Sequence, residues 1–164
     1  MREVIEMSLN PKDLDFGIRK LLWLKKTLQA RMDDVGEELV RRGVLIAKQK
    51  VADMDAVYTG QLMASIDGWY DRNTHTGAIS TNGVPYAAYV EYGTGIVGAM
   101  SYHPKADDWD YDLKHHGYEG WYYLNDRDGR VHWTAGFKSR PFMYETAEEL
   151  QDMAPKVAKE ILKR

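Results

Sequence analysis

The sequence contains no cysteine among its 164 residues, so disulfide bonds and cysteine-ligated zinc sites are excluded. No apolar stretch approaches the ~20 residues that a helix needs to cross a bilayer, and the first residues carry no apolar signal core. An excess of positive charge is also lacking, since 22 Lys and Arg stand against 25 Asp and Glu. A general grip on nucleic acid is therefore not predicted, because phosphate binding needs a local excess of Lys and Arg. We expect a protein that does not enter membranes and is made in a cytoplasm.

Aromatic side chains are plentiful, with 5 Trp and 11 Tyr. An aromatic content of 12% favours a folded chain over a disordered one. The length is enough for one domain with a core. Many of the aromatic residues fall between positions 102 and 133. There they either form a protein interface or pack hairpins, and both interpretations stay open.

Apolar residues recur at steps of three and four near the start of the chain, which is typical of one helical face. The residues of this stripe are Leu14, Ile18, Leu21, Leu28, Met32, Val35, Leu39 and Ile46. Asn10 followed by Pro11 is typical of a helix start. We expect the stripe to pack in the core, with coiled-coil dimerisation as the alternative. Glycines weaken the pattern, and we expect a break within residues 25–34.

The rest of the chain mixes strand and helix patterns. The predicted segments are strands at 62–70, 76–81, 121–124 and 130–134, a loop or insertion at 96–118, and a helix at 142–162. Residues 86–92 fit either a helix or a strand. Pro155 should kink or restart the last helix. This order predicts an α+β fold with N-terminal helices, central antiparallel strands or hairpins, and a C-terminal helix packed on the sheet.

We interpret the whole chain as one domain. Its parts are a helical part at 12–55, core strand and turn motifs at 56–95, a loop and aromatic hairpin insertion at 96–135, and a C-terminal helix at 140–164.

Sequence signals for catalysis are weak. Residues 93–98 match the spelling GxGxxG, but few residues follow before Pro104, and no second strand–helix unit comes after them. We interpret these glycines as permitting a tight or positive-φ turn, or a mobile glycine-rich loop at 93–100. Glu91 lies between two tyrosines, where a carboxylate can have a raised pKa, but it lacks a partner carboxylate. There is no Gly-x-Ser-x-Gly elbow. We predict that the chain is not an enzyme.

The best candidate for a metal site is a polar segment that contains His103, His115, His116 and Glu119. The spacing HHxxE lacks the i, i+4 histidines of a zinc-binding helix. We therefore predict no metal and no cofactor. A metal-dependent hydrolase that uses these four residues remains an alternative function.

A small basic patch is formed by Arg41 and Arg42. A solvated helix face is its ordinary interpretation, followed by a subunit contact. A small DNA-binding module that uses these two arginines is a further alternative, and it predicts DNA affinity that falls with salt.

Three motifs, taken in order, resemble those of a known family. The letters YTGQL at 58–62, followed by SI at 65–66, are similar to the turn DTG-x-L-x-x-S-I of the gp-ten-like family of tailed-bacteriophage proteins. The letters YAAYVEYGTG at 86–95 resemble its segment YA-x-x-VE-[FY]-GT, and RPFM at 140–143 resembles the RPF that opens its final helix. The resemblance covers roughly residues 12–163. Tyr58 stands where the family usually has Asp, and residues 100–135 are longer than in compact members.

The resemblance implies a structural virion protein that sits at the head–tail junction, as a neck or tail-completion protein. It implies a homo-oligomeric ring around the DNA channel and contacts with neighbouring head-connector and tail proteins, with DNA passing without a tight grip. Ring closure needs two different complementary surfaces on each subunit. The residues expected to hold the fold and its assembly surface are Thr59, Gly60, Leu62, Ser65, Tyr86, Glu91, Tyr92, Gly93, Thr94, Gly95, Pro141 and Phe142.

Overall fold

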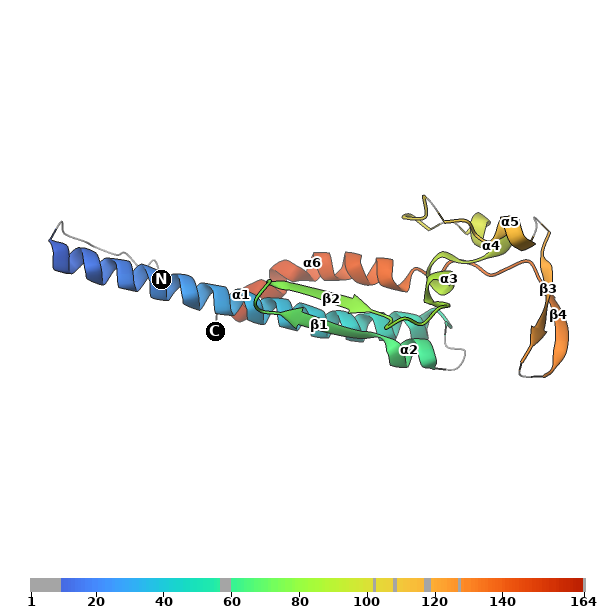
Figure 1. The fold of residues 1–164 in the computed structure, drawn as a ribbon, viewed down its shortest axis with the longest axis horizontal. Coiled ribbons are helices and arrows are strands. Elements are labelled where there is room, and N and C mark those ends of the chain that lie inside the picture. The colour runs from blue at the N-terminus through green and yellow to red at the C-terminus, as the bar shows by residue number, and fades with distance from the viewer. Residues whose placement is uncertain are drawn as a thin grey trace.

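The computed structural model describes residues 10–56, 60–101, 103–107, 109–116, 119–126 and 128–163, without the side chains of Lys114 and His115. Its elements are α1 Pro11–Asp53, α2 Gln61–Ser65, β1 Asp67–Asp71, β2 Thr76–Ser80, α3 Ala87–Tyr92, α4 Gly95–Met100, α5 Leu113–His116, β3 Trp121–Asn125, β4 Arg130–Thr134 and α6 Phe142–Leu162. The predicted α+β class is confirmed: a long N-terminal helix, two antiparallel hairpins and a packed C-terminal helix make up the fold (Figure 1).

Helix α1 is the longest element, with 43 residues. It begins as predicted, because the side chain of Asn10 accepts a hydrogen bond from the backbone N–H of Lys12 at 3.1 Å and Pro11 occupies the first turn. The predicted break within residues 25–34 is wrong, because the helix is continuous to Asp53. The helix ends against Met54, whose N–H donates to the carbonyl of Lys50 at 2.9 Å.

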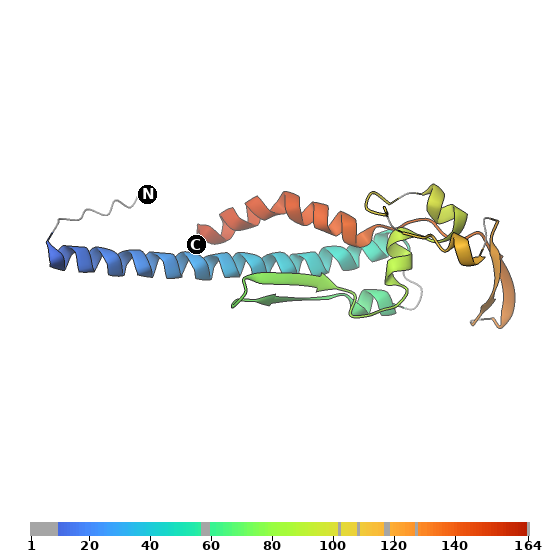
Figure 2. The same ribbon diagram turned by 45° about the horizontal axis from the view of Figure 1, so that its top comes forward.

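Two glycines of α1 mark contact points rather than weak points. A Cβ atom on Gly43 would come closer than 3.0 Å to Ile79 of β2 and to Leu150 of α6. A Cβ atom on Gly36 would similarly meet the ring of Tyr70 in β1. The missing side chains let the β1–β2 hairpin and α6 approach α1 closely, on different sides of it (Figure 2).

The β1–β2 hairpin lies along α1 and is held there by polar contacts. Asp33 of α1 accepts a hydrogen bond from the hydroxyl of Tyr70 at 3.0 Å and lies 2.7 Å from Nδ1 of His75. Arg72 in the turn donates to Glu37 at 2.7 Å. The strand predicted at 62–70 is wrong in its first half, because residues 61–65 form the short helix α2, which brings Leu62 into the core.

The core lies where the far half of α1 meets α2, α3 and α6. Its buried members are Ala47, Val51, Ala56, Leu62, Ile66, Val84, Ala87, Val90 and Phe142. Residues 86–92, which fitted two patterns, contribute helix α3. Phe142 is buried at the start of α6, as expected of an anchor for that helix.

The segment after α3 contains more helix than predicted. The loop predicted at 96–118 is wrong in part, because α4 and α5 lie within it. The predicted aromatic hairpin is confirmed as β3 and β4, with Tyr122 opposite Trp133. Helix α6 continues through Pro155 without restarting, and its axis is arched in Figure 2.

The molecule is elongated. The first half of α1 projects at one end, beyond α6 and the β1–β2 hairpin, and the β3–β4 hairpin stands at the other end (Figures 1 and 2).

Candidate functional site

The centre of the predicted site is the junction between α3 and α6, and Glu91 holds it together. Its carboxylate accepts hydrogen bonds from the N–H groups of Met143 and Tyr144, each at 2.9 Å. Nε2 of His103 lies 3.0 Å from the same carboxylate, and both side chains are buried. These amides belong to α6 and not to the loop that directly follows Glu91. The carboxylate caps the N-terminus of α6, where negative charge is favoured.

The glycine turn after Glu91 is packed against the strand that leads into α6. Thr94 exchanges two backbone hydrogen bonds with Phe137, at 3.0 and 3.2 Å. Gly93 and Gly95 have φ values of 81° and 62°, which confirms the predicted positive-φ turn. A Cβ atom on either glycine would also come closer than 3.0 Å to backbone atoms of residues 135–139. The expected glycine-rich loop at 93–100 is instead a turn followed by helix α4.

The other predicted residues divide into two groups. Tyr86, Tyr92, Pro141 and Phe142 lie at the same α3–α6 junction, where the ring of Tyr92 stacks on that of Trp109 at 4.9 Å between centroids.

Leu62 and Ser65 belong to α2, and Gly60 directly precedes it. Gly60 has a φ of 77°, Leu62 is buried, and the hydroxyl of Ser65 donates to the carbonyl of Leu62 at 2.8 Å. These residues therefore build the core below the junction. Thr59 lies outside the described residues.

A cavity of about 760 Å³ opens beside this junction. Its lining is mostly apolar and includes Tyr86, Tyr89, Val90, Trp121 and Phe137. Thr94 and Arg140 also line it, and Oγ1 of the first and Nε of the second are buried without a hydrogen-bond partner. Sequence reasoning did not place Arg140 in the site, because nothing in its local pattern indicates burial.

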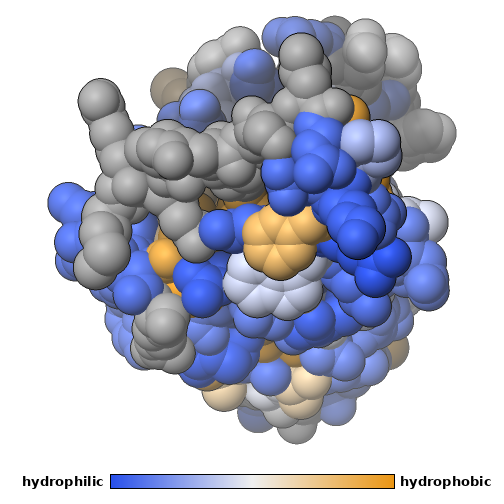
Figure 3. All heavy atoms as spheres, turned by 90° about the vertical axis from the view of Figure 1, so that its left-hand side faces the viewer, coloured by the Kyte–Doolittle hydropathy of each residue, from blue (hydrophilic) through white to orange (hydrophobic). Residues whose placement is uncertain are grey.

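The first half of α1 forms an exposed apolar arm, defined here as residues 11–28. Eight large apolar side chains of the arm are between 36% and 69% exposed: Leu14, Phe16, Ile18, Leu21, Leu22, Trp23, Leu24 and Leu28. The prediction that this part of the stripe packs in the core is therefore wrong. Figure 3 looks along the molecule from this end and shows apolar side chains breaking an otherwise hydrophilic surface.

A second exposed apolar surface lies at the opposite end, on the β3–β4 hairpin. The register places Tyr122 opposite Trp133 and Leu124 opposite Val131, so these four alternate residues share one face of the hairpin. They are between 55% and 74% exposed. The aromatic residues of the 102–133 segment therefore divide, since Trp109 packs between Tyr89 and Tyr92 and the hairpin face is uncovered.

The histidines of the proposed metal segment have separate partners. His103 is buried against Glu91, and Nδ1 of His116 lies 2.6 Å from Asp112. Glu119 is exposed, and the side chain of His115 lies outside the described part of the chain. Among the described residues, no group of three or more His, Asp or Glu side chains is placed to hold a metal ion.

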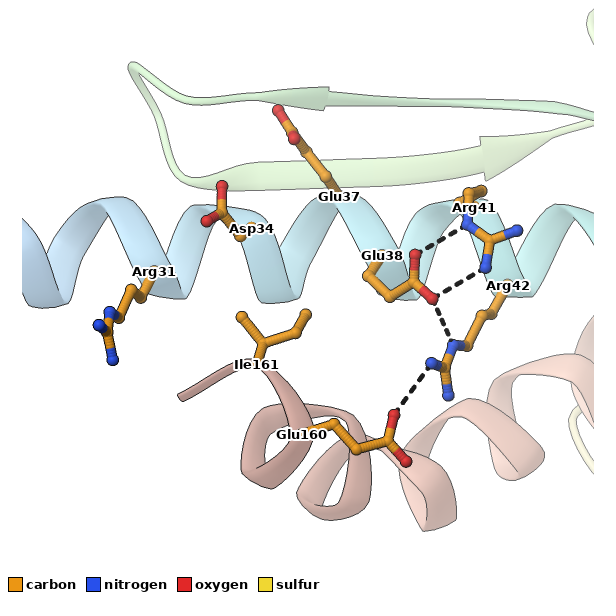
Figure 4. Close-up of a pocket in the computed structure, with 8 residues that line it drawn as sticks. All are labelled: Arg31, Asp34, Glu37, Glu38, Arg41, Arg42, Glu160 and Ile161. Atoms are coloured by element: carbon orange, nitrogen blue, oxygen red, sulfur yellow. Dashed lines mark hydrogen bonds and ion pairs between the residues drawn. The ribbon is translucent and has the colours of Figure 1, made fainter. Parts of the chain in front are cut away.

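The basic patch lies in a groove of about 530 Å³ between α1 and α6 (Figure 4). Arg41 and Arg42 both donate to Glu38, and Arg42 also reaches Glu160 at 3.1 Å. Hydrogen bonds from Arg41 and then Arg42 lower the pKa of Glu38 to about 2. Asp34 and Glu37 line the same groove, so the three arginines there face four carboxylates.

No protein-family model, curated protein or solved structure matches this chain. None of the described helices combines the length and the apolar character that a bilayer span requires.

Proposed function

We propose that this chain is a structural virion assembly protein of a tailed phage or prophage, acting at the head–tail junction as a neck or tail-completion protein. In this role it forms or joins a ring around the DNA channel and contacts neighbouring head-connector and tail proteins. The resemblance of its three ordered motifs to the gp-ten-like family supports the location. The observation that carries the assembly role is the exposed apolar arm of α1.

The exposed arm favours an associated state of the protein over a monomer. Covering the exposed half of a large apolar side chain contributes on the order of 1 kcal/mol, so covering all eight contributes on the order of 8 kcal/mol. Association costs roughly 4–15 kcal/mol in lost freedom of motion. One arm contact is therefore close to balance, and stable assembly needs several contacts that act together, as they do in a ring.

The hydrolase alternative is not favoured by the contacts of its residues. A catalytic metal needs several ligands and an open position for water. His103, the first of the four candidates, is buried and already bonded to the carboxylate that caps α6. Its environment is that of a structural side chain.

The DNA-binding alternative is weakened by the neighbours of its arginines. Binding to phosphates draws on Lys and Arg whose charge is locally in excess. Arg41 and Arg42 instead pair with Glu38 and Glu160, so the charges of these two arginines are already neutralised within the groove.

The test is the molar mass in solution, measured by light scattering on the 18.9 kDa chain alone and mixed with portal-side and tail-tube proteins from the same gene neighbourhood. We expect a defined multimer or co-assembly. Leu22→Ser should reduce it, because Leu22 is 62% exposed on the arm. Leu45→Ser is the matched control, because Leu45 is 56% exposed on the same helix outside the arm. A strict monomer that ignores every such partner would contradict the proposal.

A further inference from the structure

We propose that the arm of one copy packs on the apolar face of the β3–β4 hairpin of the next copy, so that identical subunits join end to end. This inference rests on the proposed assembly function and names the two surfaces that meet.

The exposed apolar face of the β3–β4 hairpin is suited to packing against another element. An isolated two-stranded hairpin is marginal in water unless a further strand or a helix packs on it. Among the described residues, sheet β3–β4 has two strands, and Leu124 and Val131 form an exposed cross-strand pair beside Tyr122 and Trp133. A helix with apolar side chains is the element that suits such a face.

The arm is a helix of that kind. With 3.6 residues per turn, Leu14, Ile18 and Leu21 share one face. Phe16 and Trp23 are seven residues apart and fall about half a turn away from that face. A helix that is apolar on both sides is normally buried among neighbours. The arm therefore offers a stripe to one surface and two aromatic side chains to another.

The two surfaces cannot meet within one copy. The arm projects at one end of the molecule and the hairpin stands at the other (Figure 1). Helix α1 is continuous from the arm into the core, so the arm cannot fold back at a break. Contact between unlike surfaces on successive copies is heterologous, and it gives a ring when the rotation closes.

Charge selects the hairpin over a second arm. Residues 11–28 contain five Lys or Arg and two Asp, so that two arms side by side would repel each other. Residues 103–134 contain seven Asp or Glu and four Lys or Arg. The hairpin, residues 121–134, is neutral with two Asp and two Arg, and the net charge of −3 lies in residues 103–119, which precede it in the chain. An arm with a net charge of +3 that seats on the hairpin therefore approaches an acidic neighbouring segment, whereas a second arm would bring like charges together.

The natural absence of cysteine makes cross-linking a clean test. Leu22→Cys on the arm and Leu124→Cys on the hairpin face would be prepared as separate proteins, mixed, and treated with a short bismaleimide linker. We expect the mixed adduct in several-fold higher yield than the adduct between two Leu22→Cys chains. Leu45→Cys in place of Leu124→Cys is the control. All three leucines are more than half exposed, so the variants should fold.

Four outcomes overturn the inference. Two of them apply to a chain that still forms multimers: a yield with the Leu45→Cys control equal to that with Leu124→Cys, or a dominant adduct between two arms. Either result would overturn the docking inference and would leave the assembly function standing. A chain that stays monomeric with every neighbouring protein would remove both. As an independent readout, Leu124→Ser and Val131→Ser should each weaken self-association by roughly tenfold. Unchanged association in both variants would also contradict the proposed contact.

Discussion

Glu91 shows how one side chain joins three elements. It leaves α3, accepts the N–H groups of Met143 and Tyr144 in α6, and meets His103 from the segment after α4. A buried carboxylate is tolerated only when it is paired, and here each oxygen has a donor. The cap therefore fixes where α6 begins and how it leaves the junction.

We expect Glu91→Ala to lower the free energy of unfolding by roughly 3 kcal/mol, because two backbone amides and the ring of His103 lose their acceptor in a buried place. Chemical denaturation measures this change. Glu148→Ala, at an exposed position on α6, should change stability by less than about 0.5 kcal/mol. Equal effects of the two substitutions would show that the cap contributes nothing specific.

Glu38 makes stability depend on acid. Its pKa falls from 4.5 to about 2 in the folded chain, through hydrogen bonds from Arg41 and then Arg42. The unfolded chain binds this proton more readily, so the stabilisation is complete above pH 4.5 and is lost as the pH falls towards 2. We expect the difference in free energy of unfolding between the natural chain and Glu38→Gln to shrink as the pH falls across this window. A difference that stays constant from pH 6 to about 3 would contradict the assignment.

At the scale of elements, α1 has two halves with different surroundings. The far half is enclosed by α6 and the β1–β2 hairpin, whereas the arm projects beyond them, and its last turn reaches the hairpin through Lys25 and Leu28, which line a pocket with Tyr70 and His75. Gly43 lies in the enclosed half, where a Cβ atom would meet both Ile79 of β2 and Leu150 of α6.

Gly43→Ala should therefore destabilise the fold by about 1–3 kcal/mol through overpacking, although alanine is the better helix former by about 1 kcal/mol. Thermal or chemical unfolding measures the change. Ile79→Val removes the atom nearest to the new Cβ, so the double variant should recover part of the loss relative to Gly43→Ala. A stabilised Gly43→Ala variant would mean that packing at this point is loose.

Sequence patterns predicted the elements whose signals are local. The start of α1 at Asn10, the β3–β4 hairpin and the run of α6 depend on caps, turns and periodicity within a few residues. The continuity of α1 through residues 25–34 was missed, because glycines lower helix propensity but here permit close packing of other elements. Helix α2, with five residues, is too short to show a period.

The sequence predicted which residues belong to the candidate site better than it predicted how those residues contact one another. Glu91 was identified, but its acceptor role spans 52 residues to Met143, a distance that no local pattern reports. The exposure of the arm was missed for a related reason. An apolar stripe at helical spacing looks the same in sequence whether its partner is the chain's own core or another subunit.

At the scale of the whole molecule, the arm extends about 27 Å, at 1.5 Å per residue. A helix of this length without tertiary contacts is marginal in water. We expect backbone amides of residues 11–28 to exchange hydrogen rapidly in the free chain and slowly in the assembly, with residues 33–53 protected in both. Hydrogen exchange measured by mass spectrometry tests this expectation. Amides of the arm that exchange as slowly in the free chain as those of residues 33–53 would contradict it.

The unbroken α1 has a geometric consequence. If the arm seats on the next copy, the orientation between successive copies is set by the bending stiffness of one helix and not by a hinge. A closed circle requires each copy to turn by a full rotation divided by the number of copies. The direction of α1, together with the angle at which the β3–β4 hairpin stands, would then set the width of the opening at the centre.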